Sequence, residues 1–369
     1  MKVLITNDAK KIAGGENYVL HLAEGLSQKG YEILIAPLRN SELELEANRR
    51  GYRTISISYA SKGREFNLVR DFVHKFRNEK VDVIHSNSNL DRTIASFAGK
   101  IIGAKNIASI HSCLSINRNL VHWYRNKYII DHFTPVGFST RKIMIESDKI
   151  PSDKITVVHI GIPENSIKRT EEGRKKVRKE FCIGHNEFVV GTLSRLVEFK
   201  GHKFLLKAIQ HVIIESALPI KLMIVGDGEL KVQLIQLAKE YGIYDRVIFT
   251  GNRKDVSDIL SAFDVFAQFS INGGGETFPV AIIEALATEL PVIGSKVGDI
   301  EYLIDNNING FLVEPENVQQ FANSLKNLIN NNELLKIMGE KSNEKFIKEF
   351  TLDKMIRSVE EVYNKVMMN

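Results

Sequence analysis

Residues 273–315 carry the densest pattern in the chain: GGGETFPVAIIEALATELPVIGSKVGDIEYLIDNNINGFLVEP. Gly273, Gly274 and Gly275 predict a loop with conformations that other residues rarely adopt. The apolar segment 280–287 predicts a largely buried helix. Pro279 is expected in its first turn, where the missing N–H is not needed. The stretch therefore predicts a helix whose N-terminus is reached through a glycine-rich loop.

Two glutamates lie in this stretch, Glu276 in the loop and Glu284 in the helix, with seven residues between them. A helix N-terminus offers free backbone N–H groups and the positive end of a dipole, which together favour an anion. Carboxylates beside such a site can accept hydrogen bonds from hydroxyl groups. A nucleotide-sugar offers both features, a diphosphate and the hydroxyls of ribose and sugar, so we expect this class of ligand.

The same stretch resembles the donor-binding segment of glycosyltransferase family four. Glu276 and Glu284 correspond to the paired glutamates of that family. Leu-Pro-Val at 290–292 corresponds to its Gly-Leu-Pro-Val segment, and Gly-Phe-Leu-Val at 310–313 to its Gly-Leu-Leu-Val. Paired glutamates alone would be a weak signal, whereas the ordered set over about forty residues is specific.

The resemblance implies the α/β GT-B fold, in which two doubly wound Rossmann-like domains face each other across a cleft. It also implies that the sugar is transferred with retention at the anomeric carbon. The implied donor-binding residues surround the helix start: Thr277, Phe278, Pro279, Val280 and Glu284. Thr277 stands where Gly or Ser is common, and Glu289 and Asp299 replace frequent glycines. The resemblance therefore carries no sugar preference.

Short apolar runs alternate with amphipathic stretches such as 16–28 and 66–78. This alternation is typical of a parallel sheet with helices on both faces. Open sheets of this kind bind ligands beyond the carboxyl ends of their strands. The predicted strands are 2–6, 32–36, 54–58, 81–85, 106–110 and 155–159, followed by 188–193, 221–226, 246–250, 264–268 and 291–294.

A length of 369 residues suggests two domains. The periodicity breaks near 162–172, so we expect an acceptor-binding Rossmann-like domain at 1–165 and a donor-binding one at 166–349. Because GT-B enzymes end in a helix that crosses back onto the first domain, residues 350–369 are assigned to such a helix.

Arg195 and Lys200 follow the predicted strand 188–193. An arginine matches the forked geometry of phosphate, and a lysine supplies a point charge. Fixed cations at this place stabilise the charge that develops on a departing diphosphate. The spacing also matches the Arg-Leu and Lys-Gly segment of the family, so we expect both residues, with Glu276, to be catalytic. No Asp-x-Asp motif is present, and we expect no catalytic metal.

Three other strand ends carry candidates. Gly14 and Gly15 predict a close backbone approach to phosphate, although the G-x-G-x-x-G fingerprint is missing. His111 corresponds to a histidine that lies near the donor sugar in related enzymes, so we also expect it to be catalytic, by donating to a sugar hydroxyl or contacting the developing charge. Gly226 and Gly228 match a Gly-x-Gly that usually lines the nucleotide pocket. Each has a structural alternative, a flexible turn for the glycines and a packed ring for the histidine.

The composition, 43% hydrophobic and 26% charged, is that of a globular protein. The first apolar run is too short for a signal peptide, and no window approaches a membrane-spanning length. Cys113 and Cys182 have no metal or redox spacing. We therefore expect two unpaired thiols in a reducing cytoplasm.

Charge is unevenly distributed: residues 1–163 hold 24 Lys/Arg against 16 Asp/Glu, and the remainder 26 against 29. The basic part could face phospholipid headgroups or a phosphorylated acceptor, or could simply be solvated. No nucleic-acid motif is present, so no nucleic-acid partner is expected. Residues 118–128 mix aromatic and basic side chains and could lie on a membrane. We favour the alternative, with Trp123 and Tyr128 in the core.

Together these features predict a retaining glycosyltransferase of the hexosyltransferase type. The expected donor is a UDP-sugar, with GDP- and ADP-sugars as alternatives, and no resident cofactor is expected. The expected acceptor is a glycan or lipid-linked hydroxyl in surface polysaccharide, lipopolysaccharide or lipid-linked glycan synthesis, in the cytoplasm or on the inner membrane face. Alternatives are a sugar-phosphate or sucrose synthase-type GT-B enzyme, or a nucleotide-sugar-binding protein without turnover.

Overall fold

The chain folds into two compact units, Met1–Gly161 with Leu352–Asn369, and Ile162–Thr351. The computed structural model describes residues 1–12, 14–59, 65–216, 219–273 and 275–368. Gly274 of the glycine-rich loop lies outside these residues. The division falls after Gly161, whereas the sequence places it after residue 165.

Unit 1 is built on a six-stranded parallel sheet with the order β3-β2-β1-β4-β5-β6. The chain starts in the middle of this sheet and reverses its direction of travel between β1 and β4. That switch point is where doubly wound sheets bind ligands. The strands are β1 (Lys2–Asn7), β2 (Glu32–Pro37), β3 (Arg53–Thr54), β4 (Val83–Ser86), β5 (Lys105–Ile110) and β6 (His132–Pro135).

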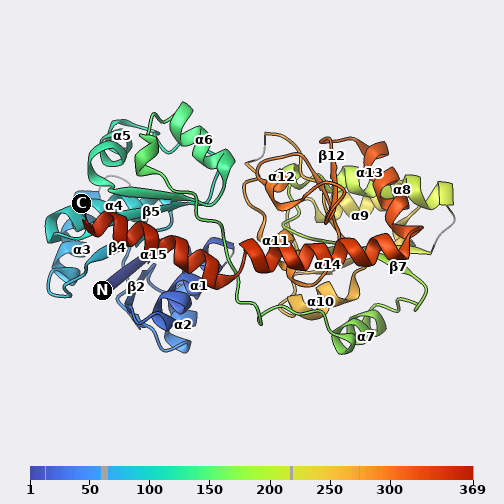
Figure 1. Cartoon of the computed structure of the whole chain (residues 1–369), viewed down its shortest axis with the longest axis horizontal. Helices are drawn as coiled ribbons and strands as arrows, with labels where there is room; N and C mark the ends of the chain where they lie inside the picture. Colours follow the sequence, from blue (N-terminus) through green and yellow to red (C-terminus); the bar gives the residue numbers. More distant parts are fainter. Residues whose placement is uncertain (13, 60–64, 217–218, 274, 369) are drawn as a thin grey trace. The chain divides into compact units, whose positions relative to one another are not determined.

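Helices connect these strands, and the last helix of the chain returns to this unit (Figure 1). Gly25 allows it to approach the first helix, because a Cβ there would lie 2.3 Å from Ile356 Cγ1. The helices are α1 (Gly14–Gln28), α2 (Glu42–Arg49), α3 (Glu65–Phe76), α4 (Asn89–Ile102), α5 (Leu120–Tyr124), α6 (Phe138–Glu146) and α15 (Leu352–Met368).

Unit 2 repeats this topology in a second parallel sheet, of order β12-β11-β10-β7-β8-β9. Its switch point lies between β7 and β10. Most strand residues are buried, as expected where helices cover both faces. The strands are β7 (Phe188–Leu193), β8 (Ile220–Val225), β9 (Val247–Gly251), β10 (Val265–Gln268), β11 (Val292–Ser295) and β12 (Gly310–Val313).

The helices of unit 2 supply most of the apolar side chains that pack on this sheet. They are α7 (Glu171–Glu180), α8 (His202–Ser216), α9 (Lys231–Glu240), α10 (Val256–Ala262), α11 (Val280–Ala287), α12 (Ile300–Leu303), α13 (Val318–Ile329) and α14 (Asn332–Glu349).

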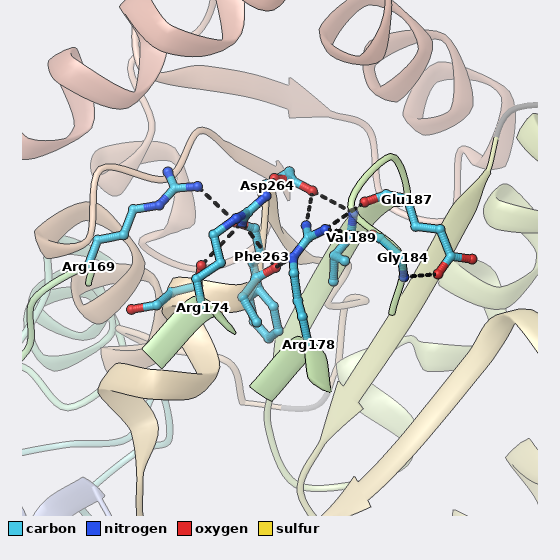
Figure 2. Close-up of polar contacts among 10 residues, drawn as sticks. Arg169, Arg174, Arg178, Gly184, Glu187, Val189, Phe263 and Asp264 are labelled. Atoms are coloured by element: carbon cyan, nitrogen blue, oxygen red, sulfur yellow. Dashed lines mark hydrogen bonds and ion pairs between the residues drawn. The ribbon is translucent and has the colours of Figure 1, made fainter. Parts of the chain in front are cut away.

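An arginine cluster attaches α7 to the amino end of β10 (Figure 2). Asp264 accepts hydrogen bonds from Arg174 (2.7 Å), Arg178 (2.8 Å) and the Val189 backbone N–H (2.8 Å). Both guanidinium groups also donate to backbone carbonyls around the end of α10, and Arg169 donates to Phe263 O at 3.2 Å. The cluster thus satisfies carbonyls that the end of a helix leaves free.

Two strand predictions are wrong. Residues 155–159 form no strand, but run beside β6 through an isolated bridge between Ile155 and Phe133. The prediction missed β12 and β6. In β6, His132, Thr134 and Pro135 interrupt the apolar pattern although all three are buried. The run 54–58 also contracts to the short β3.

Candidate functional site

The loop after β7 carries Arg195 and Lys200 at the carboxyl end of a central strand. A short 3₁₀ turn ends at Gly201, whose φ is +65°. A Cβ at this position would lie 1.9 Å from Phe269 O. Only glycine fits such an approach, and this contact places Lys200 against the loop that follows β10.

Lys200 forms a buried ion pair with Glu276, as its Nζ lies 2.7 Å from Glu276 Oε2. The side chains are 13% and 5% exposed. The same oxygen accepts hydrogen bonds from Ser270 Oγ (2.5 Å) and Gln268 Nε2 (3.2 Å). The structure therefore brings together two residues that were predicted from separate motifs. All three contacts are made by Glu276 Oε2, and no described residue donates to Glu276 Oε1.

The loop around Glu276 is fixed from a third segment, which follows β11. Gly298 has a φ of +58°, and a Cβ there would lie 2.4 Å from Glu276 O. The next residue, Asp299, donates its backbone N–H to Thr277 O at 2.9 Å. A side chain at position 298 would therefore displace the glutamate.

Sequence reasoning missed Gln268, Ser270 and Gly298 as residues that position the site. Gln268 ends β10, Ser270 follows it by two residues, and Gly298 lies three residues after β11. The sequence could have indicated these residues through their position, because they lie at the carboxyl ends of neighbouring parallel strands, where polar side chains converge.

The helix α11 begins at Val280, and Pro279 is its N-cap rather than a first-turn residue. Pro279 has an extended ψ of 109°, so the helix starts one residue later than expected. Phe278 is buried and packs edge-on against Phe350. Thr277 donates its hydroxyl to Gly275 O at 3.2 Å. These contacts fix the chain entering the helix.

Glu284 lies on the second turn of α11, and its carboxylate has no hydrogen bond or ion pair with the described residues. Burial raises its pKa to about 7. A half-buried carboxyl group without a partner destabilises the free protein, which is expected of a group whose partner is a ligand.

Glu284→Gln is expected to raise the free energy of unfolding above that of wild type, and to raise it more at pH 8 than at pH 5. In wild-type protein the pKa of Glu284 is about 7 in the folded state, against 4.5 for an ordinary glutamate. The contribution of Glu284 to wild-type stability is therefore greatest below pH 4.5, where the carboxyl group is neutral in both states, and it falls as pH rises through about 7. The gain in unfolding free energy over wild type should grow by about 2 kcal/mol between these pH values. Urea unfolding measures it, with the exposed Glu301→Gln as control. A gain that is equal at both pH values would contradict the burial of an unpaired carboxyl group.

The two glycines after β8 do not face open space. The Cβ of a residue at 226 would lie 2.1 Å from Ser194 O, and at 228 it would lie 2.5 Å from Leu196 O. Both glycines therefore allow their loop to pack against the loop that carries Arg195. The Arg195 side chain is exposed and forms no ion pair within the described part of the chain.

In unit 1, Gly14 and Gly15 begin α1 directly after the loop that follows β1, as predicted. Tyr18 of this helix packs edge-on against His111, with ring centroids 4.7 Å apart. Neither ring nitrogen of His111 has a hydrogen-bond partner in the described structure. Burial, and then the charge of Arg92, lower the His111 pKa to about 4. A neutral imidazole with free nitrogens can bind a ligand hydroxyl. By contrast, His85 is buried and bonded to Tyr363 and Ser109, which fits a structural role.

The preferred interpretation of residues 118–128 is wrong, because the aromatic side chains are exposed. Trp123 is 43%, Tyr124 48% and Tyr128 51% exposed, while Arg125 is fully buried. Lys127 Nζ lies 5.1 Å from the Trp123 ring centre and 5.3 Å from that of Tyr128. The aromatic rings lie outside because the chain buries the arginine and its hydrogen-bonded neighbours instead.

The described residues contain neither a candidate metal site nor a candidate membrane-spanning helix. No cluster of three or more His, Cys, Asp or Glu side chains could hold a metal ion. None of the described helices has the length and apolar character needed to cross a membrane.

Two sequence families match the chain, Glycosyltransferase Family 4 over residues 12–166 and Glycosyl transferases group 1 over residues 173–345. N-acetyl-alpha-D-glucosaminyl L-malate synthase of Bacillus anthracis is 25% identical over 298 residues, covering 78% of this chain and 76% of the relative. UDP-Gal:alpha-D-GlcNAc-diphosphoundecaprenol alpha-1,3-galactosyltransferase of Escherichia coli is 25% identical over 324 residues, covering 83% and 82%.

Among solved structures, Anabaena HepE in complex with UDP superposes with a TM-score of 0.87 at 20% identity. The match covers 99% of this chain and 100% of that one. With the two doubly wound sheets, this likeness confirms the GT-B fold expected from the sequence.

Proposed function

This chain belongs to glycosyltransferase family four, and we propose on that premise that it transfers a sugar from a UDP-sugar to a hydroxyl of a glycan or lipid-linked acceptor. The observation that carries the proposal is the Lys200–Glu276 pair beside the β7–β10 switch point. It offers a cation for phosphate and a carboxylate with a free oxygen for sugar hydroxyls.

The proposed roles follow from exposure and charge. Arg195 is exposed and without an ion-pair partner among the described residues, so it can bind the diphosphate through two parallel hydrogen bonds. Lys200 neutralises the same group. Glu276 Oε1 accepts hydrogen bonds from the sugar. Glu284 accepts those of the ribose, which would supply the partner that its carboxylate lacks.

The chemistry we infer is loss of the diphosphate from the anomeric carbon, with its growing negative charge stabilised by Arg195 and Lys200. Attack by the acceptor hydroxyl on the face from which the diphosphate leaves would retain the configuration. The departing phosphate would accept the proton of that hydroxyl. We assign no covalent nucleophile, since Glu276 is paired with Lys200 and is given the sugar hydroxyls, and Glu284 is given those of the ribose. No metal is assigned a role.

The names of relatives support the choice of donor and acceptor. The Escherichia coli relative is named for a UDP-Gal donor and a diphosphoundecaprenol-linked acceptor, and the Anabaena structure holds UDP. We infer a role in the synthesis of a cell-surface or lipid-linked glycan, carried out at the cytoplasmic side.

The proposal is tested by acceptor-free hydrolysis of UDP-, GDP- and ADP-sugars, with and without EDTA. We expect slow release of UDP from one UDP-sugar, unchanged by EDTA. A thermal-shift screen against the same nucleotides should give the largest rise in melting temperature with UDP. A ligand at 100 times its Kd stabilises the folded protein by about 2.7 kcal/mol. UDP binding without any release would favour a binding protein without turnover. Abolition by EDTA with rescue by Mn²⁺ would contradict the proposed stabilisation by Arg195 and Lys200 alone.

We further propose that unit 1 binds an anionic membrane through the exposed aromatic residues of 118–128. Leu120 is 83% exposed and Trp123 43%, beside Lys127. Binding to anionic vesicles should weaken with salt, because the Debye length falls from ~10 Å at 0.1 M to ~3 Å at 1 M. Emission of Trp123, the single tryptophan of the chain, should shift to the blue on binding. Unchanged emission and no co-sedimentation at low salt would contradict this location.

A further inference from the structure

A cavity of about 140 Å³ lies in unit 1 at the carboxyl ends of β4 and β5. One wall is the segment after β4, including Asn87 and Arg92, and the other is the segment after β5, including His111 and Arg118. The cavity adjoins the β1–β4 switch point. Its size suits a single phosphate or carboxylate group rather than a whole sugar.

Arg92 is buried in this wall without a counter-ion. Its side chain is 5% exposed, and Nη2 donates to the neutral Asn89 Oδ1 at 3.0 Å. Its Nε has no hydrogen-bond partner within the described structure. Arg118, on the opposite wall, is exposed and likewise forms no ion pair with a described residue. Two cations thus line one small cavity.

A third arginine adds positive charge behind the cavity. Arg125 is fully buried and donates to Asn126 Oδ1 (2.8 Å) and Thr93 Oγ1 (2.5 Å), both neutral groups. Its Nη2 has no partner among the described atoms. Burial, and then the charge of Arg92, lower the Arg125 pKa to about 8. Buried charges in proteins are normally paired, so this cluster lacks an anion.

The nearby carboxylates do not supply that anion, because backbone and hydroxyl donors already hold them. Asp91 accepts hydrogen bonds from Thr6 Oγ1 (2.7 Å) and Ser88 N (2.8 Å). Asp148 accepts from Ser115 Oγ (2.5 Å) and Ile116 N (3.1 Å). Asp8, the remaining acidic group that influences Arg92, accepts from backbone N–H groups at the start of α4.

We propose that this cavity binds an oxyanion, the phosphate or carboxylate group of the acceptor, between Arg92 and Arg118. His111 can donate one N–H to the same group. The binding of an anion is independent of the proposed transfer. Only its identification as part of the acceptor rests on the proposed function.

The test uses inorganic phosphate as the probe and the whole chain. Wild-type protein in 50 mM phosphate should melt about 2–5 °C higher than in sodium chloride of equal ionic strength. Arg118→Ala and Arg92→Met should each lose at least half of this shift. Arg118 is exposed, so its substitution tests the site even if Arg92→Met does not fold.

Two control variants separate this cavity from other effects. Arg70→Ala removes an exposed arginine of α3 and should keep the full shift, which corrects for general stabilisation by phosphate. Arg195→Ala weakens the proposed donor site and should keep most of the phosphate-induced shift in melting temperature. A shift that is lost in Arg195→Ala but kept in Arg118→Ala would overturn the proposal, as would no shift in wild type. UDP is added in parallel: if UDP stabilises no variant, the proposed function fails while the phosphate result still decides the cavity.

Vesicles of phosphatidylcholine with and without phosphatidic acid then identify the source of the anion. If soluble phosphate reduces co-sedimentation with phosphatidic acid more than sodium chloride of equal ionic strength does, and this excess is lost in Arg118→Ala, the anion is a lipid phosphate. If phosphate and sodium chloride act equally, while the phosphate shift in melting temperature depends on Arg118, the anion belongs to a soluble acceptor. Either result supports the site.

Discussion

Arg195→Ala and Lys200→Ala are each expected to lower kcat/KM for glycosyl transfer by about 10²-fold or more. The reason is the loss of a fixed cation at the departing diphosphate, typically worth ~3 kcal/mol of transition-state stabilisation. Arg195 has no side-chain partner among the described residues, so its loss should act on turnover and leave the fold intact. Lys200→Ala also leaves Glu276 buried without its cation, so its stability should fall as well.

The matched control is Lys203→Ala, which removes an exposed lysine that pairs with Glu198 at the start of α8. Its kcat/KM should stay within about twofold of wild type. Steady-state kinetics with a UDP-sugar, after a check of folding by circular dichroism, make the comparison. A folded Arg195 or Lys200 variant that loses less than threefold would show that these residues do not stabilise the leaving group.

Asp264→Ala is expected to lower the free energy of unfolding of unit 2 by about 3–5 kcal/mol, because it leaves the buried Arg178 and the partly buried Arg174 without their counter-ion. Arg178 is 8% exposed at its side chain and would keep only backbone carbonyls as partners (Figure 2). The α7 helix would lose its main polar attachment to β10.

Urea unfolding followed by circular dichroism measures this loss as a lower midpoint. The control is Asp245→Ala, an exposed aspartate in the loop before β9, which should change stability by no more than about 0.5 kcal/mol. A loss below about 1 kcal/mol for Asp264→Ala would mean that the cluster does not attach α7.

Local pattern predicted most of the fold, because strands of a parallel sheet that is covered on both faces are near-continuous apolar runs. The apolar segment 280–287 was predicted as a helix and forms α11, while Pro279, expected in its first turn, is the N-cap. The exceptions have physical causes. β6 contains His132 and Thr134, which are buried with hydrogen bonds and so do not look like core residues in sequence. Trp123 lies outside because Arg125, an unusual core residue, lies inside.

The site was predicted as a set of residues but not as a geometry. That Lys200 pairs with Glu276 depends on the approach of Gly201 to Phe269. No local pattern reports a contact between residues that lie 76 positions apart in sequence. The φ of +58° at Glu289 lies in the left-handed region that favours glycine, which explains why glycine is frequent at this position; nothing in the structure explains the glutamate. The buried arginines of unit 1 gave no sequence signal, since burial of a charge is visible only in three dimensions.

The most direct test of the central claim, that the carboxyl edge of the second sheet binds the donor, is titration calorimetry of UDP. Wild-type protein, Arg195→Ala and Glu284→Gln are compared at pH 8. We predict that both substitutions weaken UDP binding by at least about tenfold, equal to 1.4 kcal/mol. Unchanged UDP affinity in both folded variants would place the nucleotide elsewhere and contradict the assignment of this site.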